Sequence, residues 1–212
     1  MGLHFSKEEF LQRKSAVIQS MKDQNIDALL MFRQESMYWL TGYDTFGYVF
    51  FQCLVLTSKG NKILLTRSAD LRQAQLTSII KEIRIWKDKE NSNPTKDLKD
   101  ILVELSLENK SIGIEYDAYG LTGKNTMRLN KELDRFAKLS DASFLITKLR
   151  LIKSEQEIRY IKKAAELGDK ALKKGWELAH PGSHESDILA SMQGAVFSGG
   201  GDYPGNEFII GS

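Results

Sequence analysis

The sequence of 212 residues predicts an α/β fold. Short apolar runs typical of buried strands alternate with segments of helical periodicity over about the first 145 residues. Two of these runs flank a four-residue turn, which predicts an antiparallel hairpin. A capping box then opens a second region near Lys148. Together these features predict a mixed sheet covered by helices, followed by the start of another domain.

The N-terminal segment predicts a helix that leads into a buried strand. Ser6 and Glu9 have the spacing of a capping box, in which the serine hydroxyl accepts a hydrogen bond from a backbone N–H of the first turn. Apolar residues at helical spacing follow and end at Gln24-Asn25. Residues 26–32 then form a short apolar run typical of a buried strand.

The next part of the chain predicts the hairpin and then further alternation. Residues 50–57 and 62–66 are strand-like, and the turn at 58–61 can supply the positive φ that a hairpin needs. Further along, the sequence predicts helices at 70–80 and from Pro94, and strands at 82–86 and 111–115.

Residues 148–212 predict a separate, mainly helical region. Ser154 and Glu157 form a second capping box ahead of a long helix that His180-Pro181-Gly182 stops, and Ser183 is expected to cap the next helix. The expected apolar stripe of the long helix is Ile158, Ile161, Ala165, Leu172, Trp176 and Ala179. The last apolar run, 208–210, has the pattern of a strand, and a strand needs a hydrogen-bonded neighbour.

Composition excludes several classes of protein. Apolar residues make up 42% and charged residues 27%, with a net charge of only +2, which argues against a nucleic-acid partner or a membrane-surface partner. No run of apolar residues is long enough to span a membrane, and the N-terminus lacks a signal-peptide pattern, so a cytoplasmic location is expected. The single cysteine, Cys53, lies in an apolar run and is expected to be a buried, inert thiol.

Motifs that could carry chemistry are few. His184 and Asp187 are three residues apart and could share a metal, but Asp187 is better explained as complementing a helix dipole. The glycine run 199–201 follows a predicted helix and lacks the Lys-Ser or Lys-Thr of a phosphate loop, so a flexible connection is expected. The aromatic stretch at 38–48 fits a binding surface and a corner of the core equally well.

Three stretches taken together resemble the creatinase, prolidase and aminopeptidase P superfamily, the pita-bread hydrolases. They are YWLTGY at 38–43, LRLIKSEQEIRYIKKAA at 149–165 and GNEFIIGS at 205–212. The end of the chain is most similar to Xaa-Pro-peptidase-like and ectoine-hydrolase-like members. The resemblance implies a creatinase N-terminal-like α/β domain at 1–147. The first helices and first strand of an incomplete α+β pita-bread domain then follow at 148–212.

The resemblance also implies what this chain lacks. The family's metal ligands, and the histidine that non-metal relatives use, lie beyond the strand that ends this sequence. No residue here is therefore expected to be catalytic or to bind a metal, and no cofactor is expected in this chain. Two divalent ions (Mn, Co or Zn) are an expectation for the complete family enzyme only.

Substrate-contacting residues are expected in two places. In dimeric family members the loop that matches 43–48 reaches into the neighbouring subunit's active site, which implies a homodimer and gives Tyr43, Asp44, Phe46 and Tyr48 as candidates. Asn206 and Glu207, before the predicted last strand, are further candidates. Creatinase has an arginine where this chain has Tyr48, so a guanidino-acid substrate is not supported.

Three functional hypotheses follow. The first is that the chain is the N-terminal portion of a C–N bond hydrolase of the Xaa-Pro peptidase or creatinase type, acting on small peptides or peptide-like solutes when complete. The second is a truncated, non-catalytic module for dimerisation or solute binding. The third is a lyase that acts on a small osmolyte, with a cation held against the aromatic rings.

Overall fold

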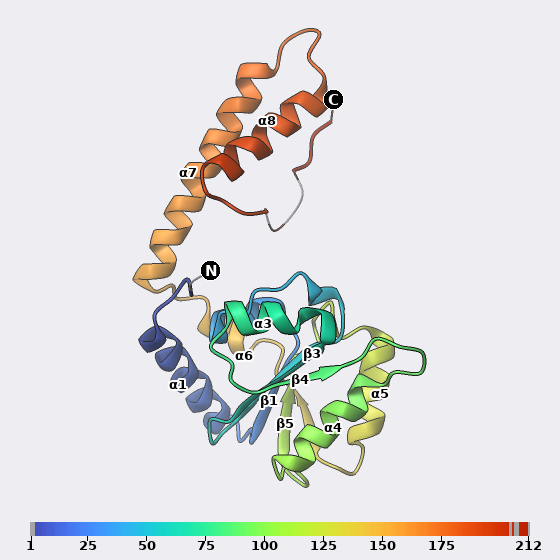
Figure 1. The fold of residues 1–212 in the computed structure, drawn as a ribbon. Coiled ribbons are helices and arrows are strands. Elements are labelled where there is room, and N and C mark those ends of the chain that lie inside the picture. Colours follow the sequence, from blue (N-terminus) through green and yellow to red (C-terminus); the bar gives the residue numbers. More distant parts are fainter. Residues whose placement is uncertain (1–2, 204, 206–207, 212) are drawn as a thin grey trace. The chain divides into compact units, whose positions relative to one another are not determined.

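The computed structural model describes residues 3–211 except 204, 206 and 207. The chain divides into two compact units, Met1–Leu151 and Ile152–Ser212 (Figure 1). The sequence-based boundary after residue 147 lies within the short helix α6 (Leu145–Leu149), and as an assignment of domains it stays a prediction. No helix in the described ranges is both long and apolar enough to cross a membrane.

The first unit is built on a six-stranded mixed sheet. Its strands are β1 (Ala28–Met31), β2 (Cys53–Thr57), β3 (Lys62–Arg67), β4 (Ile83–Trp86), β5 (Ser111–Ile114) and β6 (Lys138–Asp141). They lie side by side in the order β4-β3-β2-β1-β5-β6. The pairs β1–β2 and β2–β3 are antiparallel and the other three pairs are parallel. The predicted α/β class and mixed sheet are confirmed.

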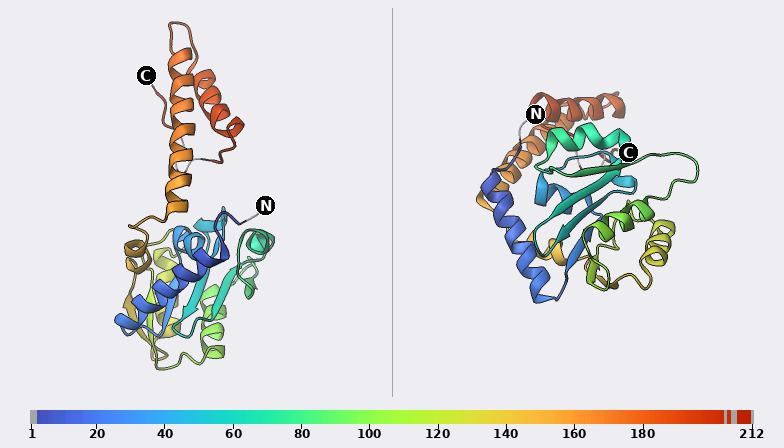
Figure 2. Two further views of the ribbon diagram at one scale, coloured as in Figure 1. Left: turned by 90° about the vertical axis from the view of Figure 1, so that its left-hand side faces the viewer. Right: turned by 60° about the horizontal axis from the view of Figure 1, so that its bottom comes forward.

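Helices cover both faces of this sheet (Figure 2). One face carries α4 (Pro94–Glu104) and α5 (Gly123–Leu133), and the other carries α1 (Lys7–Asp23), α2 (Gln34–Thr41), α3 (Leu71–Thr77) and α6. Because successive side chains of a strand point to opposite faces, the apolar runs divide between two cores. Leu30, for example, lies in one core, whereas Leu29 and Met31 lie in the other.

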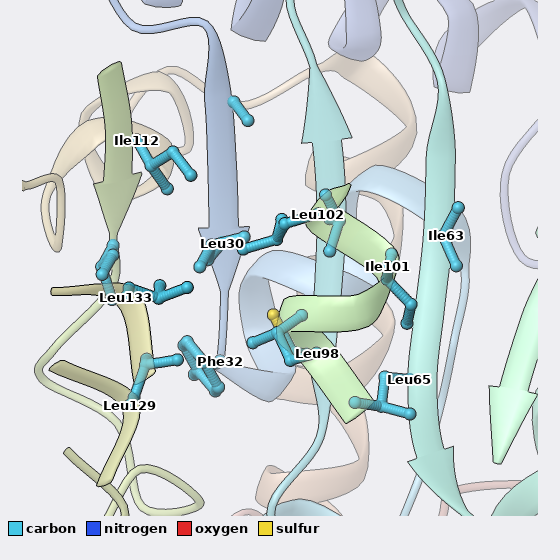
Figure 3. Close-up of a cluster of buried hydrophobic side chains, with 14 of the residues drawn as sticks. Leu30, Phe32, Ile63, Leu65, Leu98, Ile101, Leu102, Ile112, Leu129 and Leu133 are labelled. Atoms are coloured by element: carbon cyan, nitrogen blue, oxygen red, sulfur yellow. The ribbon is translucent and has the colours of Figure 1, made fainter. Parts of the chain in front are cut away.

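Figure 3 shows the side chains that fill the core between the sheet and the helices α4 and α5. Leu98, Ile101 and Leu102 of α4 lie over the strands and belong to one cluster with strand side chains such as Leu30 and Leu65. These five side chains are buried, with at most 4% of each surface exposed. Burying a leucine or isoleucine side chain contributes about 1.5–3 kcal/mol, so this packing stabilises the whole sheet.

Cys53 lies inside this core and is fully buried. Burial raises the pKa of its thiol well above the usual range, and the nearby Glu115 carboxyl acts in the same direction. We expect no reaction of the folded chain with a thiol reagent such as DTNB at pH 8, and one equivalent after unfolding in guanidinium. A fast reaction without denaturant would contradict the buried position.

The helix starts and the hairpin agree largely with the sequence prediction. Ser6 caps α1, with its hydroxyl accepting a hydrogen bond from the backbone N–H of Glu9, whose carboxylate forms an ion pair with Arg13. The turn between β2 and β3 contains Gly60 at φ 92°, as the predicted hairpin requires. Asn93 is the N-cap of α4.

The first part of the aromatic stretch is helical, which the sequence analysis did not predict. Residues Tyr38–Thr41 form the last turn of α2, and Gly42 ends that helix at φ 81°. The sequence prediction also missed α5, β6 and α6.

The second unit contains α7 (Glu155–Leu178) and α8 (Glu185–Ser198), which pack against each other. The capping box of Ser154 and Glu157 is confirmed. The buried residues of α7 are Leu167, Ala171 and Gly175. The expected stripe of α7 is therefore wrong, because all six of its residues are exposed. Gly175, which lies against Met192 of α8, is on another side of the helix.

Two further predictions for this unit are wrong. The N-cap of α8 is His184, while the Ser183 hydroxyl donates to the carbonyl of Leu178 at 2.5 Å. Residues 208–211, which the structure describes, are not in a strand. A strand forms only where its backbone groups meet those of a neighbouring strand.

Candidate functional site

The loop between α2 and β2 carries an exposed apolar surface on the first unit. Its exposed side chains and that of Tyr119, which follows β5, form what we call the aromatic patch: Phe46 (68% exposed), Tyr48 (37%), Val49 (49%), Phe50 (40%) and Tyr119 (80%). The rings of Tyr48 and Tyr119 meet edge to face, with centroids 5.9 Å apart. Clustered apolar side chains at a protein surface commonly mark a binding site.

A buried polar network supports this loop from below. Tyr43 has no exposed surface; its hydroxyl donates to Oε1 of Gln52 at 2.7 Å and lies 3.2 Å from the Thr66 hydroxyl. Burial raises the pKa of Tyr43, so the phenol stays neutral and can donate. The Thr45 hydroxyl accepts a hydrogen bond from the backbone N–H of Gly47 at 2.8 Å. The loop is thus anchored at both ends.

Arg67, at the end of β3, holds the last part of the loop. Its guanidinium carbon lies 3.4 Å from the centroid of the Phe50 ring, which is a close cation–π contact. The same guanidinium contacts two carboxylates, with Nε 3.0 Å from Asp70 and Nη1 4.0 Å from Asp88. Phe50 is therefore fixed in position although it lies at the surface.

The predicted site residues have different positions in the structure. Phe46 and Tyr48 lie in the aromatic patch. Asp44 is half-buried, and its backbone N–H donates to the Thr77 hydroxyl at 3.2 Å. Tyr43 belongs to the core and offers no surface to a ligand. Asn206 and Glu207 lie outside the described residues.

Sequence reasoning missed the other members of the patch. Phe50 was predicted as the first residue of a strand, which in the structure begins at Cys53, and Tyr119 is distant in sequence from the loop it contacts. The position of Tyr119 just after β5 was the only available signal, because chain segments that follow neighbouring strands meet at one edge of a sheet.

A second surface feature, which we call the basic hollow, adjoins the patch. It is an open cavity of about 430 Å³ between the segment before β2, the β4–α4 loop and the first half of α5. Its lining residues are Val49, Phe50, Phe51, Trp86, Asp88, Lys89, Asn91, Ser92, Pro94, Lys124, Asn125 and Arg128. Three of these side chains are cationic and one is anionic.

A buried carboxylate lies at the start of α2. Glu115 is fully buried; one of its oxygens accepts hydrogen bonds from the backbone N–H groups of Phe32 and Arg33, both at 3.0 Å, and the other from the Ser36 hydroxyl at 2.6 Å. Burial outweighs these hydrogen bonds and raises the pKa of Glu115 to about 7. The contacts satisfy donors at a helix start, so we interpret Glu115 as a structural cap.

The described residues do not fit a metal centre. No three His, Cys, Asp or Glu side chains gather in the part of the chain that the structure covers. His184 is the N-cap of α8 and Asp187 lies in its acidic first turn, where a carboxylate is favourable.

The chain is similar in sequence to several hydrolases. An uncharacterized hydrolase/peptidase of Sinorhizobium fredii is 31% identical over 210 residues, which are 96% of this chain and 53% of that protein. The ectoine hydrolase of Halomonas elongata is 30% identical over 222 residues, covering 96% and 55%. The Xaa-Pro dipeptidase of Pyrococcus horikoshii is 27% identical over 205 residues, covering 95% and 52%. The chain thus spans about half the length of these relatives.

Solved structures share the fold. The prolidase of Thermococcus sibiricus superposes with a TM-score of 0.73 at 21% identity, over 90% of this chain and 50% of that one. The X-Pro aminopeptidase of Thermotoga maritima gives 0.71 at 20% identity, over 88% and 49%.

A family assignment covers most of the chain. Residues 13–152, which include the whole sheet and the aromatic patch, match the Creatinase/Prolidase N-terminal domain. The sequence relatives are named as hydrolases, peptidases or dipeptidases, and the structural neighbours as prolidases and aminopeptidases. The chain belongs to the Creatinase/Prolidase N-terminal domain family of the pita-bread superfamily.

Proposed function

We propose that this chain is the N-terminal portion of a C–N bond hydrolase of the Xaa-Pro peptidase or creatinase type. The complete enzyme would act on small peptides or peptide-like solutes, as the names of the dipeptidase and ectoine hydrolase relatives suggest. The observation that carries the proposal is the aromatic patch, an exposed apolar surface on a firmly anchored loop of this family's domain.

In this proposal the chain contributes binding and positioning. We further propose that the enzyme is a homodimer and that Phe46 and Tyr48 line the substrate site of the neighbouring subunit. Phe46 has the exposed area to cover a substrate, while the Tyr43 network and Arg67 hold the loop in place. Any metal ions of the complete enzyme would be held by residues outside this chain.

Activity is tested first on the protein as its source cells make it. Its intact mass and its oligomeric state by light scattering are measured, and it is assayed with Xaa-Pro dipeptides and with ectoine, each with added Mn²⁺, Co²⁺ or Zn²⁺. Hydrolysis of a C–N bond supports the proposal. A dimer without hydrolysis of any of these substrates would favour the non-catalytic module, and a product of elimination would favour the lyase.

The patch is tested by Phe46→Ala in the same protein. A phenylalanine ring buried against a substrate contributes about 1.5 kcal/mol or more, so we expect kcat/KM to fall about tenfold. The matched control is Val103→Ala, which removes an exposed apolar side chain (55% exposed) from α4 and should leave kcat/KM unchanged. If both variants changed kcat/KM equally little, a substrate-binding role of the aromatic patch would be contradicted.

A further inference from the structure

The basic hollow has the size of a small-molecule site, and its lining is mainly polar. Its volume of about 430 Å³ lies in the range of roughly 300–1,000 Å³ that ligand pockets occupy. Val49 and Phe50 give it an apolar wall, and Asn91, Ser92 and Asn125 add polar side chains. Seven of the twelve lining residues are polar or charged, so the hollow suits a polar ligand.

The charges in the basic hollow do not balance. Lys89, Lys124 and Arg128 line it, and none of the three forms an ion pair in the part of the chain that the structure describes. The one acidic lining residue, Asp88, lies 4.0 Å from the guanidinium of Arg67 and is partly neutralised by it. The lining therefore carries a formal excess of two positive charges, on side chains that are exposed to solvent.

The position of two of these cations is unfavourable for the helix that carries them. Lys124 lies in the first turn of α5, which contains no acidic residue, although the positive end of a helix dipole favours carboxylates there. Lys124 and Arg128 are also four residues apart, so two like charges lie on one helical face. A bound anion would offset both the repulsion between these two cations and the unfavourable position of Lys124 in the helix dipole.

We propose that the basic hollow binds a small phosphate monoester. A phosphate ester carries close to two negative charges at neutral pH and three acceptor oxygens. Arg128 can donate two parallel hydrogen bonds to such a group, and the two lysines supply point charges. The organic part of the ligand would lie against Val49 and Phe50. The site goes beyond the proposed hydrolase function and does not depend on it.

The test is a calorimetric titration of the whole chain with three probes: inorganic phosphate, ribose 5-phosphate and AMP. We expect at least one probe to bind with a Kd below about 1 mM, and the ranking of the three identifies the organic part. The variant Lys124→Gln/Arg128→Gln should weaken that binding at least tenfold. The control Lys131→Gln/Lys138→Gln removes the same charge from exposed positions outside the hollow and should bind as the unmodified chain does.

Thermal melting gives a readout that needs no ligand. Lys124→Glu should raise the Tm of the unliganded chain, because it replaces a cation by an anion at the start of α5, and it should abolish the rise in Tm that the bound probe causes. The proposal is overturned if no probe binds, or if binding survives in Lys124→Gln/Arg128→Gln while circular dichroism shows that this variant is folded.

Discussion

Replacing Glu115 by alanine is expected to destabilise the chain by about 3 kcal/mol or more. The change leaves two backbone N–H groups and one hydroxyl without the acceptor they have now, and each buried unsatisfied group costs about 1–3 kcal/mol. These are the contacts that hold the start of α2. Urea unfolding followed by circular dichroism measures the loss, which should appear as a lower midpoint at an unchanged slope.

The same residue predicts how stability depends on pH. Its pKa is raised from 4.5 to about 7 in the folded chain, so the folded state binds the proton more tightly than the unfolded state. The stabilisation is therefore complete below about pH 4.5 and is lost as the pH rises through about 7. The free energy of unfolding is therefore lower well above pH 7 than below pH 4.5, by about 3 kcal/mol.

Glu115→Gln separates the two effects. Glutamine keeps an oxygen for the N–H groups of Phe32 and Arg33 and does not ionise, so its unfolding free energy should lack the decline that the unmodified chain shows between pH 5 and 8. Glu108→Ala, which removes an exposed carboxylate, is the control and should change stability by about 0.5 kcal/mol or less. Parallel pH curves for the unmodified chain and Glu115→Gln would contradict the raised pKa.

Glu115 also explains why sequence reasoning missed α2. The N-cap position of that helix is Arg33, whose side chain forms no capping hydrogen bond, so no local start signal is present. The cap comes instead from a residue 79 positions after Ser36. By contrast, α1 and α7 carry their own capping serines, and both were predicted at the correct residue. Capping residues in the sequence therefore identify only those helices whose first N–H groups are hydrogen-bonded by neighbouring residues of the chain.

The candidate site could be predicted only in part for a similar reason. Phe46 and Tyr43 belong to the same aromatic stretch, yet one is largely exposed and the other fully buried. The difference depends on Gln52 and Thr66, which lie on other parts of the fold and provide partners for the Tyr43 hydroxyl. Tyr119 and the basic hollow arise from contacts between distant segments, which no local pattern encodes.

Gly120→Ala is expected to have the second large effect, and it acts directly on the aromatic patch. A Cβ atom at this position would lie 2.4 Å from the carbonyl oxygen of Phe50 and 3.0 Å from that of Tyr48. Both are backbone atoms and cannot rotate away, so either the loop or the segment around Gly120 must move. Forcing an extra methyl group into a packed position costs about 1–3 kcal/mol.

The loss should appear as a fall in Tm of about 5 °C, together with a change in the near-ultraviolet circular dichroism of the tyrosines. Gly123→Ala is the matched control, because a Cβ atom there meets nothing within 4 Å and alanine favours the first turn of α5. It should leave the Tm unchanged or raise it. If Gly120→Ala behaved like this control, the close approach of the two segments would be disproved, and with it the anchored patch on which the proposed substrate role of Phe46 and Tyr48 depends.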